Sequence, residues 1–197
     1  MVRLSAIAFH AALAYTVAAY PRNKRISETI LDSMVKWKPA CFAAQGGNRC
    51  NDLSVSSFQT LLAAAKPCDQ QDAADSMVDL AKSLNSSDMI RFTQIFVQQP
   101  RNTPESLSVP YCQSPPRNPE LIGLYQCQFQ GTDPTTFVGN IGVGGNGTIP
   151  FGMSSPLDPP GSCPAYPSGP IPAGAQLVDL VDSPFASESQ PESTLAQ

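Results

Sequence analysis

Six cysteines constrain the fold of this chain more than any other feature of its 197-residue sequence. Their number is even and no Cys-x-x-Cys pair occurs among them: Cys41, Cys50, Cys68, Cys112, Cys127 and Cys163. In an oxidising compartment such a set favours three disulfides over free thiols, and fifteen pairings are possible. Because three cysteines lie in each half of the chain, complete pairing requires at least one bridge between the halves. We therefore expect one covalently linked unit.

The N-terminal stretch has the pattern of a cleavable secretion signal. Arg3 precedes an apolar run rich in small residues, from Leu4 to Ala19, which ends in the small residues that signal peptidase prefers. The run is short for a membrane anchor, and His10 interrupts it. We place the signal peptide at residues 1–19, with cleavage after Ala19. The protein is predicted to be secreted and extracellular, with no later segment that spans a membrane.

Residues 20–25 have the composition of a short propeptide. They end in Lys24-Arg25, a dibasic site for a protease of the secretory pathway; the alternative is a pair of exposed charges that leads into a helix. Removal of residues 1–25 leaves eight basic residues against sixteen acidic ones, a net charge of −8. Such a charge disfavours nucleic acid and anionic membranes as partners.

The mature chain is predicted to lack histidine, because His10 is the only one and lies in the signal peptide. This removes the usual general base, the commonest metal ligand and every Ser/His or Cys/His nucleophile pair. We therefore predict no catalytic residue, no cofactor and no metal site. A pair of distant carboxylates for glycoside hydrolysis remains open, but no pair stands out.

The chain up to about residue 99 is predicted to be helical. Only three prolines precede residue 100, and apolar residues recur at helical spacing in four segments. The predicted helices span about 26–35, 54–65, 69–84 and 87–98. Pro39 and Pro67 follow the first and the second, and the expected cap of the fourth is Ser87 or Asp88. Short amphipathic helices with short connections indicate a small bundle.

Proline and glycine dominate the remainder. Residues 100–120 contain six prolines and Cys112, which predicts a tethered crossing segment without regular structure. Leu124–Gln130 alternates apolar residues with glutamines and predicts a half-buried strand. Phe137–Val143 and Thr148–Phe151 flank a Gly-Gly-Asn-Gly turn, which predicts a hairpin.

These patterns predict an α+β fold. A small N-terminal helical bundle is stapled by disulfides to a Pro/Gly-rich C-terminal part with a short antiparallel β element. The single predicted domain covers residues 26–182, with the helical part at 26–99 and the Pro/Gly-rich part at 100–182. Residues 183–197 are polar and are predicted to be a disordered tail.

Two sequons for N-glycosylation follow the predicted secretion signal, Asn85-Ser86-Ser87 and Asn146-Gly147-Thr148. We predict glycans at both; the alternative is an ordinary asparagine in a turn. The second sequon overlaps a G-x-G-x-x-G match from Gly142 to Gly147. A dinucleotide site needs a helix after this motif, and Thr148-Ile149-Pro150 does not predict one, so we interpret the glycines as a turn.

Two further features have a functional and a structural interpretation. Asp72, Asp75 and Asp79 share one face of the third predicted helix; they indicate a solvated face near a helix N-terminus, and a metal site is the alternative. Trp37, the only tryptophan, is either a platform for ligand contact, such as stacking on a sugar, or a core residue beside a disulfide.

Pro39-Ala40-Cys41 and the segment from Pro119 to Cys127, together with the signal peptide and the Lys-Arg pair, resemble small secreted cysteine-rich proteins of basidiomycete (mushroom-forming) fungi. The resemblance implies an effector-like or regulatory extracellular protein and assigns no catalytic residue. We predict a non-catalytic protein that binds an extracellular protein or a wall polysaccharide. The alternative is a secreted carbohydrate-active or cell-wall-binding protein that uses carboxylates and aromatic residues.

Overall fold

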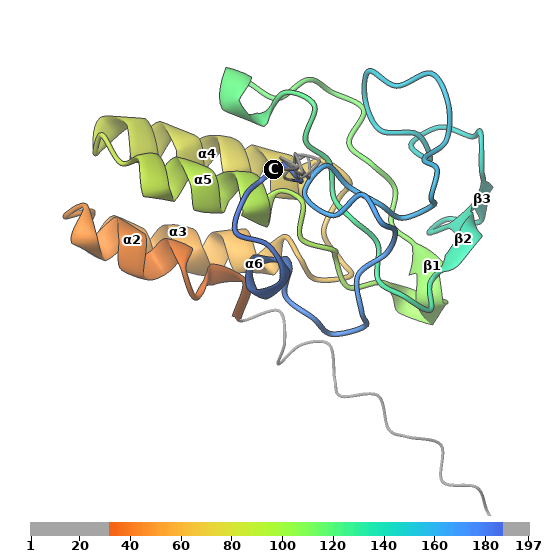
Figure 1. The fold of residues 1–197 in the computed structure, drawn as a ribbon, viewed down its shortest axis with the longest axis horizontal. Helices are drawn as coiled ribbons and strands as arrows, with labels where there is room; N and C mark the ends of the chain where they lie inside the picture. Colours follow the sequence, from red (N-terminus) through yellow and green to blue (C-terminus); the bar gives the residue numbers. More distant parts are fainter. Residues whose placement is uncertain (1–31, 187–197) are drawn as a thin grey trace, which may run out of the picture.

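The computed structural model describes residues 32–186, which Figure 1 shows as a ribbon. The predicted signal peptide, the processing positions Ala19, Lys24 and Arg25, and residues 187–197 lie outside the described residues. The same holds for the predicted helix start at residue 26. Between residues 32 and 186, no helix has the length and apolar character needed to cross a membrane.

Four α-helices pack together in the N-terminal part, which confirms the predicted bundle (Figure 1). After the 3-10 turn η1 (Asp32–Met34), these are α2 (Trp37–Ala43), α3 (Asn48–Gln59), α4 (Asp69–Ser83) and α5 (Ser87–Phe96). The later elements are short: η2 (Pro104–Ser106), β1 (Leu107–Ser108), η3 (Pro119–Leu121), β2 (Asp133–Phe137), β3 (Ile141–Gly142) and α6 (Leu177–Leu180).

The predicted helix bounds are confirmed best for α4 and least for the helices before it. Pro39 lies in the first turn of α2 instead of after a helix, because a proline there removes no intrahelical hydrogen bond. The helix expected at 54–65 begins earlier, at Asn48, where Gly47 turns the chain with a φ of 61°. α5 is capped by Ser86, whose Oγ accepts a hydrogen bond from the Met89 N–H at 3.4 Å.

The β element is a mixed three-stranded sheet and not a purely antiparallel one. β1 pairs with β2 in parallel, and β2 pairs with β3 antiparallel. The hairpin therefore turns at residues 138–140. Gly144–Gly147 does form a turn, but no strand follows at Thr148–Phe151, so the hairpin predicted around these glycines was wrong. Gly139 and Asn140 have φ values of 91° and 58°, as tight hairpin turns require.

The predicted strand at Leu124–Gln130 is also wrong: the segment makes an isolated bridge from Phe129 to Ile171, and two of its three glutamines are buried, whereas Gln130 is exposed. Gln126 and Gln128 are 5% and 4% exposed. Gln128 accepts from the Val109 N–H and donates to the Val109 carbonyl, both at 2.9 Å. Backbone groups of a proline-rich coil have no ladder partners, and buried amides satisfy them instead.

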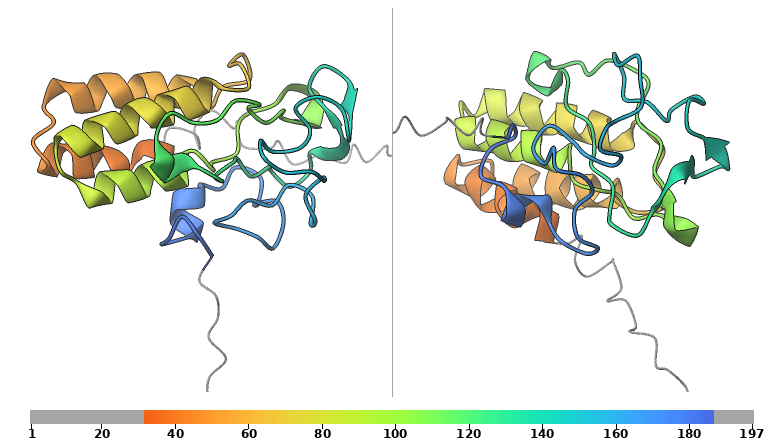
Figure 2. Two further views of the ribbon diagram at one scale, coloured as in Figure 1. Left: turned by 90° about the horizontal axis from the view of Figure 1, so that it is seen from above. Right: turned by 45° about the vertical axis from the view of Figure 1, so that its right-hand side comes forward.

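Two hydrophobic clusters meet at α5 and join the two parts. One lies in the bundle around Trp37 and takes in Leu121 and Leu124 from the later part. The other gathers Ile95 of α5 with residues of the Pro/Gly-rich part: Cys127, Phe129, Cys163, Ala165, Ile171, Leu177 and Val178. In Figure 2 the helices occupy one side of the molecule and the irregular loops the other, with α6 lying against the bundle.

The six cysteines pair in consecutive order, as Cys41–Cys50, Cys68–Cys112 and Cys127–Cys163. The first bridge joins α2 to α3, and the third lies within the Pro/Gly-rich part. The second joins the start of α4 to the crossing segment, which confirms the expected bridge between the halves. Three disulfides fit an oxidising compartment.

The last described residues, 183–186, are packed against the domain. The Gln98 side chain donates to the Pro184 carbonyl at 2.8 Å, and the Ala186 N–H donates to the Pro164 carbonyl at 3.0 Å. The prediction of disorder from residue 183 therefore does not apply to these four residues.

Candidate functional site

Trp37 is a core residue and not a ligand platform. It is 1% exposed, and its Nε1–H donates to the Thr93 hydroxyl at 3.0 Å. It lies in the helical cluster that also contains both sulfurs of the Cys41–Cys50 bridge. A buried indole cannot stack on a sugar ring, so the ligand interpretation of Trp37 is wrong and the core interpretation holds.

The acidic face of α4 binds the crossing segment. Asp75 is 1% exposed and accepts hydrogen bonds from the Arg117 N–H at 3.0 Å, the Asn118 N–H at 2.8 Å and the Asn118 side chain at 3.1 Å. Asp79 accepts from the same side chain at 2.9 Å and pairs with the Arg117 guanidinium at 3.2 Å. The prediction of a solvated face is wrong for Asp75, because the proline-rich segment needs buried acceptors.

One turn further along α4, Lys82 completes this set of contacts. Its ammonium donates to the Asn118 Oδ1 and pairs with Glu120, both at 2.8 Å. The hydrogen bond from Lys82 lowers the pKa of Glu120 below its usual value. We call these six residues the α4 latch: Asp75, Asp79, Lys82, Arg117, Asn118 and Glu120. Its carboxylates serve structure, and residues 32–186 contain no group of three or more His, Cys, Asp or Glu side chains that could hold a metal ion.

A large pocket lies where the crossing segment meets the beginning of α4. It has a volume of about 720 Å³, which is within the usual range for ligand sites. We call it the α4-start pocket. Its walls come from the loop before α4, the first turn of α4, the crossing segment and the hairpin: Ala63, Ala65, Lys66, Pro67, Cys68, Asp69, Asp72, Arg101, Asn102, Pro104, Val109, Pro110, Tyr111, Gln113, Ser114, Val138, Ile141, Asn146 and Gly147.

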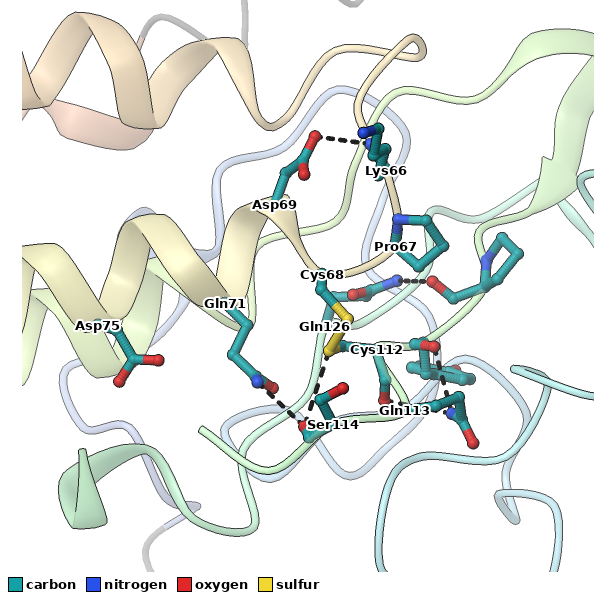
Figure 3. The surroundings of a disulfide bond; sticks show 12 residues. Lys66, Pro67, Cys68, Asp69, Gln71, Asp75, Cys112, Gln113, Ser114 and Gln126 are labelled. Atoms are coloured by element: carbon teal, nitrogen blue, oxygen red, sulfur yellow. Dashed lines mark hydrogen bonds between the residues drawn. A yellow bond between two sulfur atoms is a disulfide. The ribbon is translucent and has the colours of Figure 1, made fainter. Parts of the chain in front are cut away.

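Figure 3 shows how the Cys68–Cys112 bridge holds this region together. The Lys66 N–H donates to the Asp69 carboxylate at 2.7 Å, and Gln71 reaches across to the Ser114 carbonyl at 3.0 Å. Arg101 is 3% exposed and donates to the carbonyls of Ala65 and Pro67. Burial lowers the pKa of Arg101, and the charge of Asp69 partly offsets this effect. The pocket lining contains two basic residues, Lys66 and Arg101, and two acidic ones, Asp69 and Asp72, so its formal charges balance.

Tyr111 separates the α4-start pocket from two smaller cavities and is 3% exposed. Its ring packs edge-on against Tyr125, with centroids 6.0 Å apart. Burial raises the pKa of Tyr111 to about 12 from its usual value of 10.0. The neutral phenol is thus favoured by the folded state.

We expect Tyr111 to ionise last in an alkaline titration followed by absorbance at 295 nm, and Tyr111→Phe to remove that late step. Because the folded pKa is raised, the stabilisation is complete below pH 10.0 and is lost as the pH rises towards about 12. The loss is on the order of 2 kcal/mol. A late step that persists in Tyr111→Phe would contradict this assignment.

The third surface feature is an apolar groove between α2 and α3. It has a volume of about 440 Å³ and is lined by Asp32, Met34, Val35, Lys38, Pro39, Phe42, Ser54, Val55 and Phe58. Val35, Phe42 and Val55 are 51%, 45% and 56% exposed. Single exposed apolar residues are ordinary, but several around one hollow mark an interaction site. We call this feature the α2–α3 groove.

The predicted glycosylation sites are both accessible but lie in different settings. Asn85 and Asn146 are exposed. Asn85 follows α4 with a φ of 51° and lies in the turn to α5. Asn146 lies on the rim of the α4-start pocket. The glycines around it, Gly144 and Gly147, have φ values of 91° and 81°, so the G-x-G-x-x-G match lies in a looped turn.

Sequence reasoning missed both the groove and the latch. Val55 lies in the helix predicted at 54–65, and apolar residues that recur at helical spacing do not show that Val55 is 56% exposed. The partners of Asp75 lie more than forty residues away, and no local pattern announces them. The Cys68–Cys112 bridge brings the crossing segment to the start of α4, but the sequence left all fifteen cysteine pairings open and therefore gave no signal of this contact.

No family model, no curated protein and no solved structure matches this chain. Its function is therefore inferred from the three features above: the α4 latch, the α4-start pocket and the α2–α3 groove. Of these three, the groove is the one that exposes large apolar side chains to solvent.

Proposed function

We propose that this protein is a non-catalytic extracellular binding protein, and that its α2–α3 groove receives an amphipathic helix of a partner protein. The exposed cluster of Val35, Phe42 and Val55 carries the proposal. The three disulfides and the acidic charge support an extracellular setting. The resemblance to small secreted fungal proteins supports a regulatory or effector-like role.

The spacing of the groove residues favours a helix as the occupant. Pro39 and Phe42 lie one turn apart on α2, with Val35 in the turn before that helix, and Val55 and Phe58 face them from α3 at i and i+3. Two parallel apolar ridges leave a channel in which the ridge of a third helix packs. Asp32 and Lys38 line the same groove, so a partner helix with both a basic and an acidic residue beside its apolar stripe is complementary.

A role in binding wall polysaccharide is less well supported. Trp37 is buried, and Asp75 is fully engaged by the crossing segment, so these two features do not form a sugar site. Polysaccharide retention is therefore expected to be weak, and a pull-down on insoluble chitin, cellulose and glucan measures it directly.

The groove is tested with a displayed library of amphipathic 15-residue helices as the probe. We expect selected helices to lose at least tenfold in affinity for Val55→Asp, about 1.4 kcal/mol, because a charge then faces the apolar stripe. Ile122 is 65% exposed and lies outside the groove, so Ile122→Asp is the matched control and should bind normally.

Two results would contradict this function. Helices that bind wild type and Val55→Asp equally would place their site elsewhere. A wild-type dimer in sedimentation that dissociates in Val55→Asp would make a second copy of the chain the occupant. Since Val55 is exposed, the melting temperature of Val55→Asp should stay within a few degrees of wild type.

A further inference from the structure

Asn146 and the α4-start pocket form one unit. Asn146 and Gly147 are part of the pocket wall, and Thr148 completes the sequon. Thr148 is 3% exposed; its hydroxyl accepts from the Gly144 N–H and donates to the Gly145 carbonyl, both at 2.9 Å. This turn holds Asn146 at the mouth of the pocket. Because the Thr148 hydroxyl is occupied in the folded chain, modification of the sequon has to precede closure of the turn.

We propose that Asn146 carries an N-glycan whose first two sugar residues lie in the α4-start pocket and form part of the folded structure. The proposal goes beyond the binding function and does not depend on it. In the modification, the amide nitrogen of Asn146 bonds to C1 of a lipid-linked oligosaccharide. The lipid pyrophosphate leaves and the amide loses one proton.

The chemistry of the pocket matches the core of such a glycan. An N-acetylhexosamine has an apolar face and a rim of hydroxyl and amide groups. Val109, Pro110, Val138 and Ile141 offer an apolar wall, and the polar residues Lys66, Asp69, Asp72 and Asn102 lie around it. Two cations, Lys66 and Arg101, and two acids, Asp69 and Asp72, share the lining, which suits a neutral polar occupant better than an ion.

Because the glycan is covalently attached to Asn146, weak contacts between its sugars and the pocket are enough to keep the sugars in place. A tethered ligand binds intramolecularly, so its effective concentration at the site is far above that of a free sugar. The volume of about 720 Å³ lies well inside the range that accommodates compact ligands. Asn85 provides the contrast, because it is exposed in a turn between two helices and lines none of the four pockets described among residues 32–186.

The test compares the two glycans on the same protein. The chain is secreted from a eukaryotic host as wild type, Asn85→Gln and Asn146→Gln, and intact mass gives site occupancy. Native protein is then treated with an amidase that removes N-glycans. We expect the Asn146 glycan to be released at least tenfold more slowly than the Asn85 glycan, and both at equal rates after denaturation and reduction.

A second variant fills the pocket without touching the sequon. Ala63 is an exposed residue of the pocket wall, so Ala63→Trp should fold and should displace the sugars. In this variant the Asn146 glycan is expected to be released as fast as the Asn85 glycan. An unmodified Asn146 in the intact mass, or equal native release rates in the wild-type protein, would overturn the proposal.

Discussion

Replacement of Asp75 by alanine is expected to lower the free energy of unfolding by about 4 kcal/mol. The substitution leaves the Asn118 N–H without its acceptor and removes one of the acceptors of the Asn118 side-chain amide, and Asn118 is only 6% exposed. A buried donor that loses its partner costs about 1–3 kcal/mol, and hydrogen bonds to a charged acceptor lie at the upper end. Since Asp75 also accepts from the Arg117 N–H, three bonds to the crossing segment are lost together.

Urea unfolding followed by the fluorescence of the single tryptophan, Trp37, measures this effect in the helical part. Asp52→Ala is the matched control, because Asp52 is an exposed acid on α3, and it should change stability by less than about 0.5 kcal/mol. Asp75→Asn keeps the size of the side chain but turns one acceptor into a donor that faces the Arg117 N–H, so its loss should be intermediate. If Asp75→Ala and Asp52→Ala unfold at the same urea concentration, the latch makes no net contribution to stability.

The latch illustrates why a face of acids is ambiguous in a sequence. Asp72, Asp75 and Asp79 recur at helical spacing opposite an apolar stripe, which is the usual pattern of a solvated surface. What distinguishes Asp75 is the chain that crosses it: a segment rich in proline, with backbone donors that no helix or strand satisfies. Such a partner is defined by tertiary structure, and spacing along α4 carries no information about it.

The glutamines of the Pro/Gly-rich part are a second case in which a polar pattern in the sequence hides buried side chains. Gln126 and Gln128 alternate with apolar residues, which suggests that they face solvent. The pattern does not show whether a polar side chain is instead buried and hydrogen-bonded to the backbone. Gln98 and Gln99 are also buried, 0% and 1% exposed, and accept from the backbone N–H groups of Ala165 and Leu177. Each side-chain amide replaces a backbone hydrogen bond that a regular sheet would have supplied. Where strands are two to five residues long, buried glutamines predict a coil that is internally bonded.

The bundle was predictable because helix signals are local. α4 has an apolar face that runs through fifteen residues, and its bounds were confirmed almost to the residue. α3 was misplaced because its start depends on a close contact that the sequence does not reveal. A side chain at Gly46 would collide with both sulfurs of the Cys41–Cys50 bridge, so only glycine fits this close approach. α3 begins two residues later, at Asn48.

Removal of the Cys68–Cys112 bridge is expected to lower the free energy of unfolding about as much as Asp75→Ala does. The bridge closes a loop of 44 residues, and the loop-closure relation gives about 4 kcal/mol for the double variant Cys68→Ser/Cys112→Ser. The Cys41–Cys50 bridge closes only 9 residues, for which the same relation gives about 2.6 kcal/mol. The three loops do not overlap along the chain, so their contributions should be nearly additive.

The Cys68–Cys112 bridge is also the one whose cysteines are most exposed. Cys112 is 8% exposed and Cys68 is partly exposed, whereas the other four cysteines are between 0% and 1% exposed. Mild reduction of the native protein, trapped with iodoacetamide and read by mass spectrometry, should therefore modify Cys68 and Cys112 first, because thiol exchange requires access to a sulfur.

Urea unfolding of the two double variants separates the contributions. Trp37 reports the helical part and the circular dichroism of the tyrosines reports the part around Tyr111. Because the latch and the α5 clusters still join the two parts, we expect both probes to give one transition, at a lower midpoint in Cys68→Ser/Cys112→Ser than in Cys41→Ser/Cys50→Ser. Two separate transitions in the first variant would mean that the bridge, and not the packing at α5, makes the chain one cooperative unit.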